Sequence, residues 1–459
     1  MKLNKNIFRE YDIRGVYGID IDEEISFQIG LAFGTKLKRL GKKITLVGYD
    51  NRLSSPIIEE NVVKGITMCG VDVIRLGMVT TPIYYYGWDL LNVKCGMMIT
   101  ASHNPKDDNG FKFSYNGINN AYGDNTLEIY NMIVNRDFDI SNDKGIVTNC
   151  NIIPQYVDMI LNSVSFGNRR IKVVYDCGNG TTSIVCDEIF KRLNKYIDAI
   201  PICNVSDGNF PNHHPDPSVL ENLSMLSKSV VLNNALLGVS YDGDGDRVGF
   251  VDDKGNMINI DEFMIIIWRD LVKNKNIFKK TFYDVKCSLS LKEELDKLGV
   301  ESEFYRTGNS YTKEKSSLGN YPFSGELSGH VFFRDKFIGT DDGIYASLRM
   351  IEILTKCDKN VSSLLEGVNK YYSTREEKIS CSDDIKFKVI DYVKNYCINK
   401  GYKILTIDGV KVFFDDGSAL VRASNTGPNI TTRFEAKTKD RLDSIKKEFV
   451  DLINLCNSK

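Results

Sequence analysis

The chain has 459 residues, of which 42% are hydrophobic and 26% charged, and its formal net charge is −2. This length suits roughly three or four domains of ordinary size. A net charge so close to zero argues against non-specific nucleic-acid binding. No apolar run is long enough to span a bilayer, so no membrane association is expected. The polar segment 1–6 is followed by no apolar stretch of the signal-peptide kind, which favours a cytoplasmic location.

The eleven cysteines are scattered and form no C-x-x-C pair. An odd number without paired spacing fits reduced thiols better than a disulfide framework or a zinc site. Most of them are expected to be small core residues.

Strand-like and helix-like segments alternate along most of the chain. Apolar runs predict strands at 44–49, 71–76, 96–99, 171–175, 236–240 and 281–285. Amphipathic stretches lie between them, and one places Ile25, Ile29, Phe33 and Leu37 on a single helix face. Such alternation indicates α/β units with parallel strands, in which ligands bind beyond the carboxyl ends of the strands.

The C-terminal part has a different pattern. An amphipathic helix around 385–393 precedes short strands near 403–407, 411–414 and 419–421, and a final amphipathic helix covers 442–453. This order predicts a separate α+β domain. Three polar stretches, 141–149, 252–256 and 357–361, are candidate joints between domains.

The run Asp242-Gly243-Asp244-Gly245-Asp246-Arg247 carries the most chemical information. Three carboxylates this close repel one another unless a positive charge lies between them. Hard oxygen ligands suit Mg²⁺ or Ca²⁺, and the glycines let the backbone turn around an ion. The planar fork of the arginine suits phosphate oxygens. The run therefore predicts a metal site for phosphoryl transfer.

Two other interpretations of this run compete with a metal site for phosphoryl transfer. An acidic surface turn is the common origin of a D-G-D sequence. An EF-hand loop needs Gly at its sixth position and Glu at its twelfth, where this chain has Arg247 and Asp253. The flanking segments also read as strands rather than helices, which disfavours the EF-hand.

Thr100-Ala101-Ser102-His103-Asn104-Pro105 follows a predicted strand. A serine on such a loop can be a nucleophile or a phosphate carrier. The spacing does not match a nucleophile elbow, which needs glycines two residues on either side of the serine. Taken alone, the segment is as consistent with a structural turn as with a functional loop.

Together with the metal run, this segment resembles the α-D-phosphohexomutase superfamily, in its bacterial phosphomannomutase/phosphoglucomutase branch. The likeness runs from Phe8-Arg9-Glu10-Tyr11-Asp12-Ile13-Arg14-Gly15 to Arg433-Phe434-Glu435-Ala436, and the motifs occur in the order of the family. The resemblance implies three similar α/β mixed-sheet domains and a C-terminal α+β domain around a central cleft. Their expected ranges are 1–147, 148–253, 254–366 and 367–459.

The activity that the resemblance implies is reversible interconversion of hexose 1-phosphate and hexose 6-phosphate, with mannose, glucose or both. The family serine is a phosphoserine, here Ser102, and a hexose 1,6-bisphosphate is both intermediate and activator. One Mg²⁺ per chain is expected on Ser102, Asp242, Asp244 and Asp246. The other residues expected to take part in catalysis are His103, Lys112, Arg14, Arg247 and His330, the last as a candidate general base.

Two further segments imply how the substrate is bound. Gly325-Glu326-Leu327-Ser328-Gly329-His330 resembles the sugar-binding loop of the family, in which a carboxylate and a hydroxyl read the sugar hydroxyls. Arg422 to Arg433 resembles its phosphate-binding loop, and hydroxyls, amides and arginines suit that task. The expected substrate-binding residues are Tyr11, Lys286, Asn309, Glu326, Ser328, His330, Arg422, Ser424, Asn425, Thr426 and Arg433.

The sequence departs from the family pattern at two positions. Asn309 stands where the family usually has histidine, so that position loses any titrating role, and Gly427 stands where threonine is frequent. A phosphoglucosamine mutase is an alternative, although that branch usually has alanine at the position of Gly245. A non-catalytic sugar-phosphate binder and a hydrolase are further alternatives. A monomer or weak homodimer acting on a phosphosugar is expected.

The loop Asp207-Gly208-Asn209-Phe210-Pro211-Asn212-His213-His214-Pro215 also matches the family. It suggests no chemical role. Adjacent histidines do not easily chelate one metal ion together, so both are interpreted as loop residues.

Overall fold

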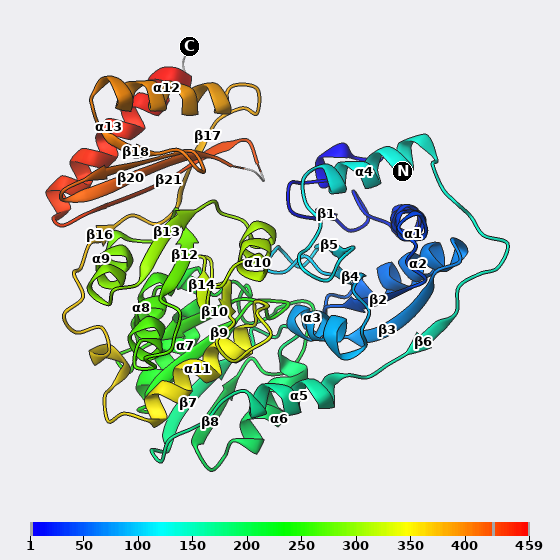
Figure 1. Ribbon diagram of the computed structural model, residues 1–459, viewed down its shortest axis with the longest axis horizontal. Coiled ribbons are helices and arrows are strands. Elements are labelled where there is room, and N and C mark those ends of the chain that lie inside the picture. The colour runs from blue at the N-terminus through cyan, green and yellow to red at the C-terminus, as the bar shows by residue number, and fades with distance from the viewer. Residues whose placement is uncertain (1–2, 425–426, 458–459) are drawn as a thin grey trace. The chain divides into compact units, whose positions relative to one another are not determined.

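The computed structural model describes residues 3–424 and 427–457, and its chain forms two compact units (Figure 1). Unit 1 comprises residues 1–260, 313–319 and 328–364, and unit 2 comprises 261–312, 320–327 and 365–459. Each unit is described separately below. No helix among the described residues is both long enough and apolar enough to cross a membrane.

The first sheet of unit 1 has six strands of mixed direction. β2 pairs in parallel with both β3 and β4, and β3 also pairs in parallel with β6. β4 and β5 are antiparallel. The order is β1 (Ile13–Val16), β5 (Asp108–Ser114), β4 (Gly96–Ile99), β2 (Ile44–Tyr49), β3 (Asp72–Met78) and β6 (Val147–Asn149).

Helices cover both faces of this sheet, with α1 and α2 on one face and α3 on the other (Figure 1). Gly30 and Gly65 allow α1 and α2 to approach closely, because a Cβ on Gly30 would lie 2.3 Å from the carbonyl oxygen of Val62. The helices are α1 (Glu23–Arg39), α2 (Ser55–Met68), α3 (Thr81–Leu90) and α4 (Asp124–Asn135). The predicted helix face of Ile25, Ile29, Phe33 and Leu37 is buried, as expected.

The second sheet of unit 1 has five strands. The order is β11 (Met257–Ile258), β10 (Val248–Val251), β9 (Leu237–Tyr241), β7 (Ile171–Asp176) and β8 (Ile197–Ile202). β7 pairs in parallel with β8 and β9, whereas β9, β10 and β11 form antiparallel hairpins. The accompanying helices are α5 (Ile153–Asn162), α6 (Ser183–Arg192) and α7 (Ser224–Leu232), and unit 1 also includes β15 (Val331–Phe333) and α11 (Gly343–Thr355).

Unit 2 contains three strands of a third sheet and all the strands of a fourth. In the third sheet, β13 (Glu301–Tyr305), β12 (Lys280–Asp284) and β14 (Phe323–Gly325) are neighbours and pair in parallel. Its helices are α8 (Ile260–Leu271), of which the first residue belongs to unit 1, α9 (Leu289–Lys297) and α10 (Asn309–Leu318), which crosses the unit boundary.

The C-terminal sheet is antiparallel and two helices pack on it. Its order is β16 (Tyr372–Ser373), β21 (Asn429–Ala436), β20 (Gly417–Ala423), β19 (Val410–Phe414) and β18 (Lys403–Leu405), and β17 (Glu377–Ser380) also pairs with β21. α12 (Lys386–Asn399) and α13 (Lys439–Asn457) bury Val389, Val393, Ile445 and Phe449 against it. The predicted α/β architecture with a C-terminal α+β domain is therefore confirmed.

Two of the predicted joints lie within or between paired strands. The stretch 252–256 is the turn of the β10–β11 hairpin, so the boundary predicted at 253 falls between two paired strands. The stretch 141–149 ends in β6, which pairs in register with β3. Polar residues suit exposed turns and edge strands as well as linkers, and the sequence pattern does not separate these cases.

Candidate active site

The predicted metal run forms the tight turn between β9 and β10 in unit 1. Asp242, Asp244 and Asp246 are fully buried, and one ligand oxygen from each lies within 4.8 Å of the others. Gly245 has a φ of +80°, a conformation that glycine adopts without strain. The backbone N–H groups of Gly245 and Arg247 donate to Oδ1 of Asp242 and so close the turn.

Burial of three carboxylates shifts their titration. Burial, followed by the charges of Asp244 and Asp246, raises the pKa of Asp242 well above its usual value. Burial acts in the same direction on Asp244 and Asp246, but the Lys112 ammonium and the other hydrogen-bonding and charged neighbours of the two carboxyl groups together offset it and hold both pKa values below the usual value. Lys112 Nζ lies 2.7 Å from Oδ2 of Asp244 and 2.6 Å from Oδ2 of Asp246.

The residues present fit a divalent cation. Oδ1 of Asp244 and Oδ1 of Asp246 are buried and accept no hydrogen bond from the described residues, and the polar atom Nδ1 of His330 lies 3.6 Å from Oδ1 of Asp246. Buried carboxylate oxygens without a partner are costly, and a hard cation is the partner that oxygen ligands prefer. Three carboxylates face the cations Lys112 and Arg247, which leaves negative charge for a metal ion to balance.

Ser102 lies on the loop between β4 and β5 and is 1% exposed. Its Oγ donates to Oδ2 of Asp242 over 2.7 Å, and its backbone N–H donates to Oγ1 of Thr100 over 2.8 Å. Its φ of +51° is in the left-handed region, which is uncommon for a residue other than glycine. The serine loop and the metal run approach closely at Gly243, since a Cβ on this residue would lie only 2.5 Å from the Ser102 carbonyl oxygen. The serine and the metal run, predicted separately, are thus in direct contact.

A buried arginine that sequence reasoning missed holds this loop. The Arg52 guanidinium donates to the carbonyl oxygens of Ser102, Asn104, Pro105 and Asp108, at 2.5–3.0 Å. It follows β2 and pairs with Asp50, its side chain being fully buried. A lone arginine after a strand carries no distinctive spacing, so its role appears only when the loop is folded against it.

Arg14 and His103 also lie at the serine loop. Arg14, on β1, donates to the Ala101 carbonyl oxygen over 3.2 Å and to Oδ1 of Asn104 over 2.8 Å. Nδ1 of His103 lies 3.3 Å from Oγ of Ser102. Desolvation, then the positive charges of Arg247 and Arg14, hold the pKa of His103 well below its usual value, so its imidazole is neutral at pH 7.

His330 is held in one tautomer by two neighbours. Its Nε2 accepts from Nε of Arg247 over 2.9 Å, so Nδ1 carries the proton and donates to Oδ2 of Asp341 over 2.9 Å. The sequence proposed His330 as a general base. In this structure both ring nitrogens are engaged, so that role requires Arg247 to move away first. Asp341, which the sequence did not predict, orients the ring.

Threonines on neighbouring elements complete the surroundings of Asp244. Oγ1 of Thr81, at the start of α3, donates to Oδ2 of Asp244 over 2.6 Å, and Oγ1 of Thr100 donates to the same oxygen over 3.2 Å. Neither was predicted, because a threonine near a strand end is common. Both hold one carboxylate oxygen, which leaves Oδ1 to face a ligand.

Unit 2 carries the second group of predicted residues. Lys286 follows β12 and is buried, with Nζ 3.6 Å from Oδ2 of Asp284 and 3.5 Å from Oε1 of Glu376. Burial alone would lower the pKa of Lys286, but the charges of Glu376, Asp284 and Glu326 raise it above its usual value. The ammonium is therefore a fixed positive charge, and Glu376 is a partner that the sequence did not predict.

Glu326 is held by the turn into α10. Its Oε1 accepts from the Gly308 backbone N–H over 3.2 Å and from Oγ1 of Thr312. Asn309 is the first residue of that helix. The predicted sugar loop is divided between the units, because Glu326 belongs to unit 2 whereas Ser328 and His330 belong to unit 1.

The predicted phosphate loop joins β20 to β21 in unit 2. Nε of Arg422 pairs with Oδ2 of Asp408 over 3.1 Å, and Nη1 of Arg433 donates to the Lys286 carbonyl oxygen over 2.5 Å. The backbone N–H of Ser424 donates to the carbonyl oxygen of Asn429. Asn425 and Thr426 lie outside the described residues. Arg433 and Lys286 are thus in contact, and both belong to the same unit as Arg422.

Tyr11 lies in the bend before β1 and is half-buried.

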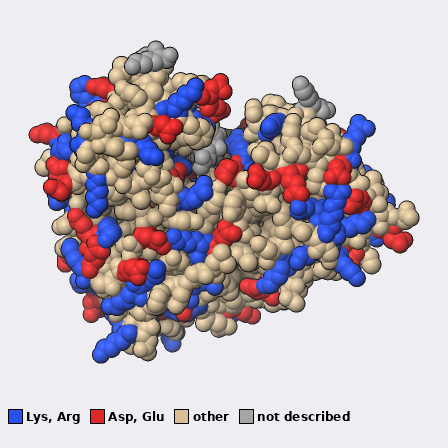
Figure 2. Space-filling view, turned by 45° about the horizontal axis from the view of Figure 1, so that its top comes forward, with Lys and Arg blue, Asp and Glu red and all other residues tan. Residues whose placement is uncertain are grey.

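On the face shown in Figure 2, basic and acidic side chains are interspersed, in keeping with the net charge of −2. Mixed charge of this kind does not favour binding of a polyanion.

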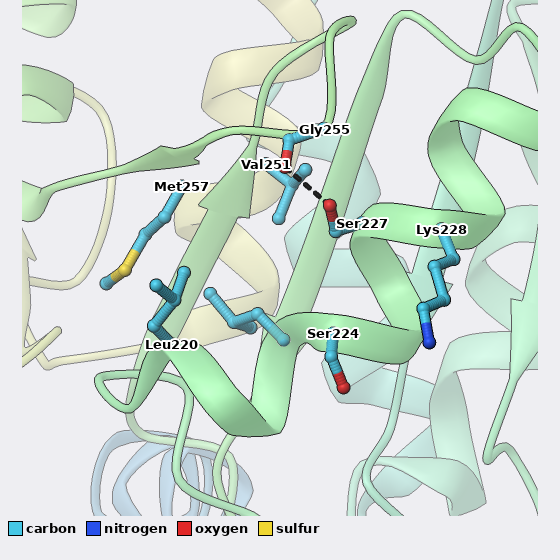
Figure 3. Close-up of a pocket in the computed structure, with 8 residues that line it drawn as sticks. Leu220, Ser224, Ser227, Lys228, Val251, Gly255 and Met257 are labelled. Atoms are coloured by element: carbon cyan, nitrogen blue, oxygen red, sulfur yellow. Dashed lines mark hydrogen bonds between the residues drawn. The ribbon is translucent and has the colours of Figure 1, made fainter.

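A pocket of about 260 Å³ lies elsewhere in unit 1, beside α7 and the β10–β11 turn (Figure 3). Oγ of Ser227 donates to the carbonyl oxygen of Gly255 at its edge. It contains none of the predicted site residues. Its lining is Leu220, Leu223, Ser224, Ser227, Lys228, Val251, Gly255 and Met257.

Comparison with known proteins identifies the family. Models of the phosphoglucomutase/phosphomannomutase α/β/α domains I, II and III match residues 5–139, 154–255 and 259–371, and the C-terminal domain model matches 374–452. The chain belongs to the phosphoglucomutase/phosphomannomutase family. Its four-domain architecture is that of this family.

Curated and solved relatives span the whole chain. The phosphomannomutase/phosphoglucomutase of Pseudomonas aeruginosa is 36% identical over 456 residues, 99% of this chain and 97% of the relative. The phosphoglucomutase of Neisseria gonorrhoeae is 36% identical over 453 residues, 98% and 97% of the two chains. The crystal structure of a phosphoglucomutase/phosphomannomutase family protein from Burkholderia thailandensis has a TM-score of 0.91 at 34% identity and covers 99% of this chain and 98% of its own.

Proposed function

We propose that this phosphohexomutase is an isomerase that interconverts hexose 1-phosphate and hexose 6-phosphate, with mannose, glucose or both as the sugar. The observation that carries the proposal is the 2.7 Å hydrogen bond from Oγ of Ser102 to Asp242 in a buried cluster of three carboxylates. A phosphate carrier needs this proximity to a cation site, because a phosphoserine adds a charge of about −1.5 to −2. The full-length relatives named as mutases support the same activity.

The proposed reaction uses Ser102 as the phosphoryl carrier. The phosphoserine P–O bond breaks as the free hydroxyl of the sugar phosphate bonds to the same phosphorus, which gives a hexose 1,6-bisphosphate. The hydroxyl proton leaves to a base, for which His330 is the candidate. The bond between the sugar oxygen and the other phosphorus then breaks as that phosphoryl group bonds to Oγ of Ser102, and the base returns its proton to the released sugar oxygen. By the same transfer, a hexose 1,6-bisphosphate also serves as the activator that loads the serine.

The charged side chains have positioning and electrostatic roles in this scheme. Phosphoryl transfer depends on placement and on stabilising charge on the transferred group. Lys112, Arg14 and Arg247 would stabilise that charge, and neutral His103 can hydrogen-bond the phosphoryl group. Bound to Asp242, Asp244, Asp246 and Ser102, one Mg²⁺ per chain would supply Lewis-acid stabilisation of phosphoryl oxygens.

Substrate recognition is assigned to the remaining predicted residues. Glu326 and Ser328 would bind sugar hydroxyls, whereas Lys286, Arg422 and Arg433 suit the phosphate that is not transferred. Tyr11, Asn309, His330, Ser424, Asn425 and Thr426 complete the proposed substrate site.

We also propose domain ranges of 1–147, 148–253, 254–366 and 367–459. We further propose that the protein acts as a monomer or weak homodimer and binds neither nucleic acid nor a membrane. A cytoplasmic location is proposed because the cysteines are free thiols.

A turnover assay tests the proposed function. The protein is assayed with Mg²⁺ and a trace of glucose 1,6-bisphosphate on mannose 1-phosphate, glucose 1-phosphate and glucosamine 1-phosphate. Formation of 6-phosphates from the mannose and glucose substrates supports the proposal, and preference for glucosamine 1-phosphate would favour the alternative mutase. Release of inorganic phosphate would indicate a hydrolase. If the folded, primed protein isomerises none of the three, the proposal is wrong.

A further inference from the structure

A second cluster of metal-ligating side chains lies in unit 1, formed by Asp176, Cys203 and His213. One ligand atom from each lies within 4.8 Å of the others. None of the three belongs to the proposed active site. His213 comes from the loop 207–215, for which the sequence suggested no chemical role.

The sheet brings the first two residues together. Asp176 is the last residue of β7, and its register partner on the parallel strand β8 is Ile202, directly before Cys203. The carboxyl ends of parallel strands meet at one edge of a sheet, so both side chains lie at that edge. The widely separated sequence positions explain why a search for paired cysteines misses this cluster.

The donor atoms are already oriented. Nε2 of His213 lies 3.0 Å from Oδ2 of Asp176, and Nδ1 of His213 lies 3.0 Å from the carbonyl oxygen of His214. Oδ1 of Asp176 accepts from the backbone N–H of Gly178 over 2.8 Å. Metal-binding histidines usually have their second nitrogen fixed by a carbonyl or carboxylate in this way.

The backbone around Cys203 is held firmly. Its φ of +46° is in the left-handed region, and its carbonyl oxygen accepts from the backbone N–H of Asn179 over 2.8 Å. Nδ2 of Asn212, the residue before His213, donates to Oδ1 of Asn179 over 2.7 Å. Asn179 therefore links the cysteine segment to the histidine loop, so the three donor residues are already close together before an ion binds.

We propose that Asp176, Cys203 and His213 form a binding site for one Zn²⁺ ion. Thiolate, imidazole and carboxylate together suit Zn²⁺, whereas Mg²⁺ prefers oxygen ligands alone. Water fills the fourth tetrahedral position. The ion replaces the proton between Nε2 of His213 and Asp176, and that proton and the thiol proton of Cys203 go to solvent. The site is independent of the proposed mutase activity.

Without a metal ion, a hydrogen bond of 3.0 Å between Nε2 of His213 and Oδ2 of Asp176 holds the loop. Zn²⁺ takes the place of the shared proton and adds the thiolate of Cys203 as a ligand.

The test is a Co²⁺ titration of the full-length protein with Mg²⁺ in excess, which occupies the carboxylate site. Tetrahedral Co²⁺ bound to a thiolate gives a ligand-to-metal charge-transfer band. The wild type is expected to bind one Co²⁺ per chain with this band, and Zn²⁺ should abolish it. Cys203→Ser should lose the band and His213→Gln should weaken binding, whereas Cys150→Ser, a half-buried cysteine outside the cluster, should keep both.

The proposal is overturned if the wild type shows no thiolate band, or if the band survives in Cys203→Ser. X-ray absorption of the zinc-loaded wild type gives an answer even if the variants fail to fold. One sulfur at about 2.3 Å with lighter ligands at about 2.0–2.1 Å is expected. A shell without sulfur contradicts the site.

Discussion

Ser102 and the three aspartates share one hydrogen-bond network, so the charge of each group affects the others. Oδ2 of Asp242 accepts from Ser102, and the pKa of Asp242 is raised by burial and by its two neighbouring carboxylates. Such crowding costs stability, and a site that keeps it does so for binding a cation.

Asp242→Asn should separate stability from metal binding. Because the change removes a source of repulsion, the metal-free variant should be at least as stable as the wild type. Mg²⁺ at a hundredfold excess over its Kd should stabilise the wild type by about 2.7 kcal/mol and the variant far less. Thermal unfolding with and without Mg²⁺ measures both. Asp252→Asn, in the next turn of the same sheet, should respond to Mg²⁺ as the wild type does, and an equal response of Asp242→Asn would contradict the assignment.

Arg52→Lys tests whether the serine loop must be held by a planar, multidentate donor. Lysine keeps the charge but cannot reach four carbonyl oxygens, so the loop should shift. A displacement of about 1 Å can cost on the order of 100-fold in kcat, while KM should change little. The unfolding free energy should fall by about 1–3 kcal/mol, because buried carbonyls lose their donors. Steady-state kinetics and urea unfolding measure the two effects.

The matched control for this change is Arg75→Lys. Arg75 forms a bidentate pair with Glu59 in the same domain but is part-exposed, and among the described residues it forms no hydrogen bond with the serine loop. Its kcat should stay near the wild-type value. A kcat for Arg52→Lys within twofold of the wild type would show that Arg52 does not position Ser102.

At the level of elements, the two facing helices α1 and α2 depend on glycine. Gly30→Ala would place a methyl group 2.3 Å from the Val62 carbonyl oxygen. The helices must separate, which should lower the unfolding free energy by about 1–3 kcal/mol. Chemical denaturation measures this change. Lys38→Ala, on the exposed face of α1, should cost less than about 0.5 kcal/mol, and equal costs would contradict the packing.

The N-terminus of α11 should make stability depend on pH. Burial raises the pKa of Asp342 to about 7, although its carboxylate accepts from the Tyr345 backbone N–H and from Tyr156. The folded state therefore binds more protons than the unfolded state between about pH 4 and pH 7, so stability from this group falls as pH rises through that window. Asp342→Asn should weaken the pH dependence in urea unfolding. An unchanged slope would contradict the raised pKa.

Sequence patterns predicted these elements unevenly. The buried strands β2, β4, β7, β9 and β12 were predicted within a residue or two, because continuous apolar runs mark them. Short or polar strands such as β6 and β11 were not, because their pairing partners lie far away in the chain. Tertiary pairing, not local preference, makes these residues strands.

At the scale of the whole molecule, residues with distinctive spacing were predicted and their supporting residues were not. Ser102 and Asp242 come from separate motifs and meet directly, as do Lys112 and Asp244. Arg52, Asp341, Glu376 and Thr81 act through contacts that only folding creates, so the sequence carries no local signal for them. The same holds for Cys203, whose neighbours Asp176 and His213 are distant in the chain.

The proposed mechanism requires Ser102 to carry the phosphoryl group, and locating a transferred phosphoryl group is the sharpest test of that role. Dephosphorylated wild type and Ser102→Ala are each incubated with glucose 1,6-bisphosphate and Mg²⁺, and the modified peptide is identified by mass spectrometry. We expect one phosphoryl group on Ser102 of the wild type and none on the variant, which should also lack isomerase activity while staying folded. Phosphorylation at another residue, or isomerisation by Ser102→Ala, would contradict it.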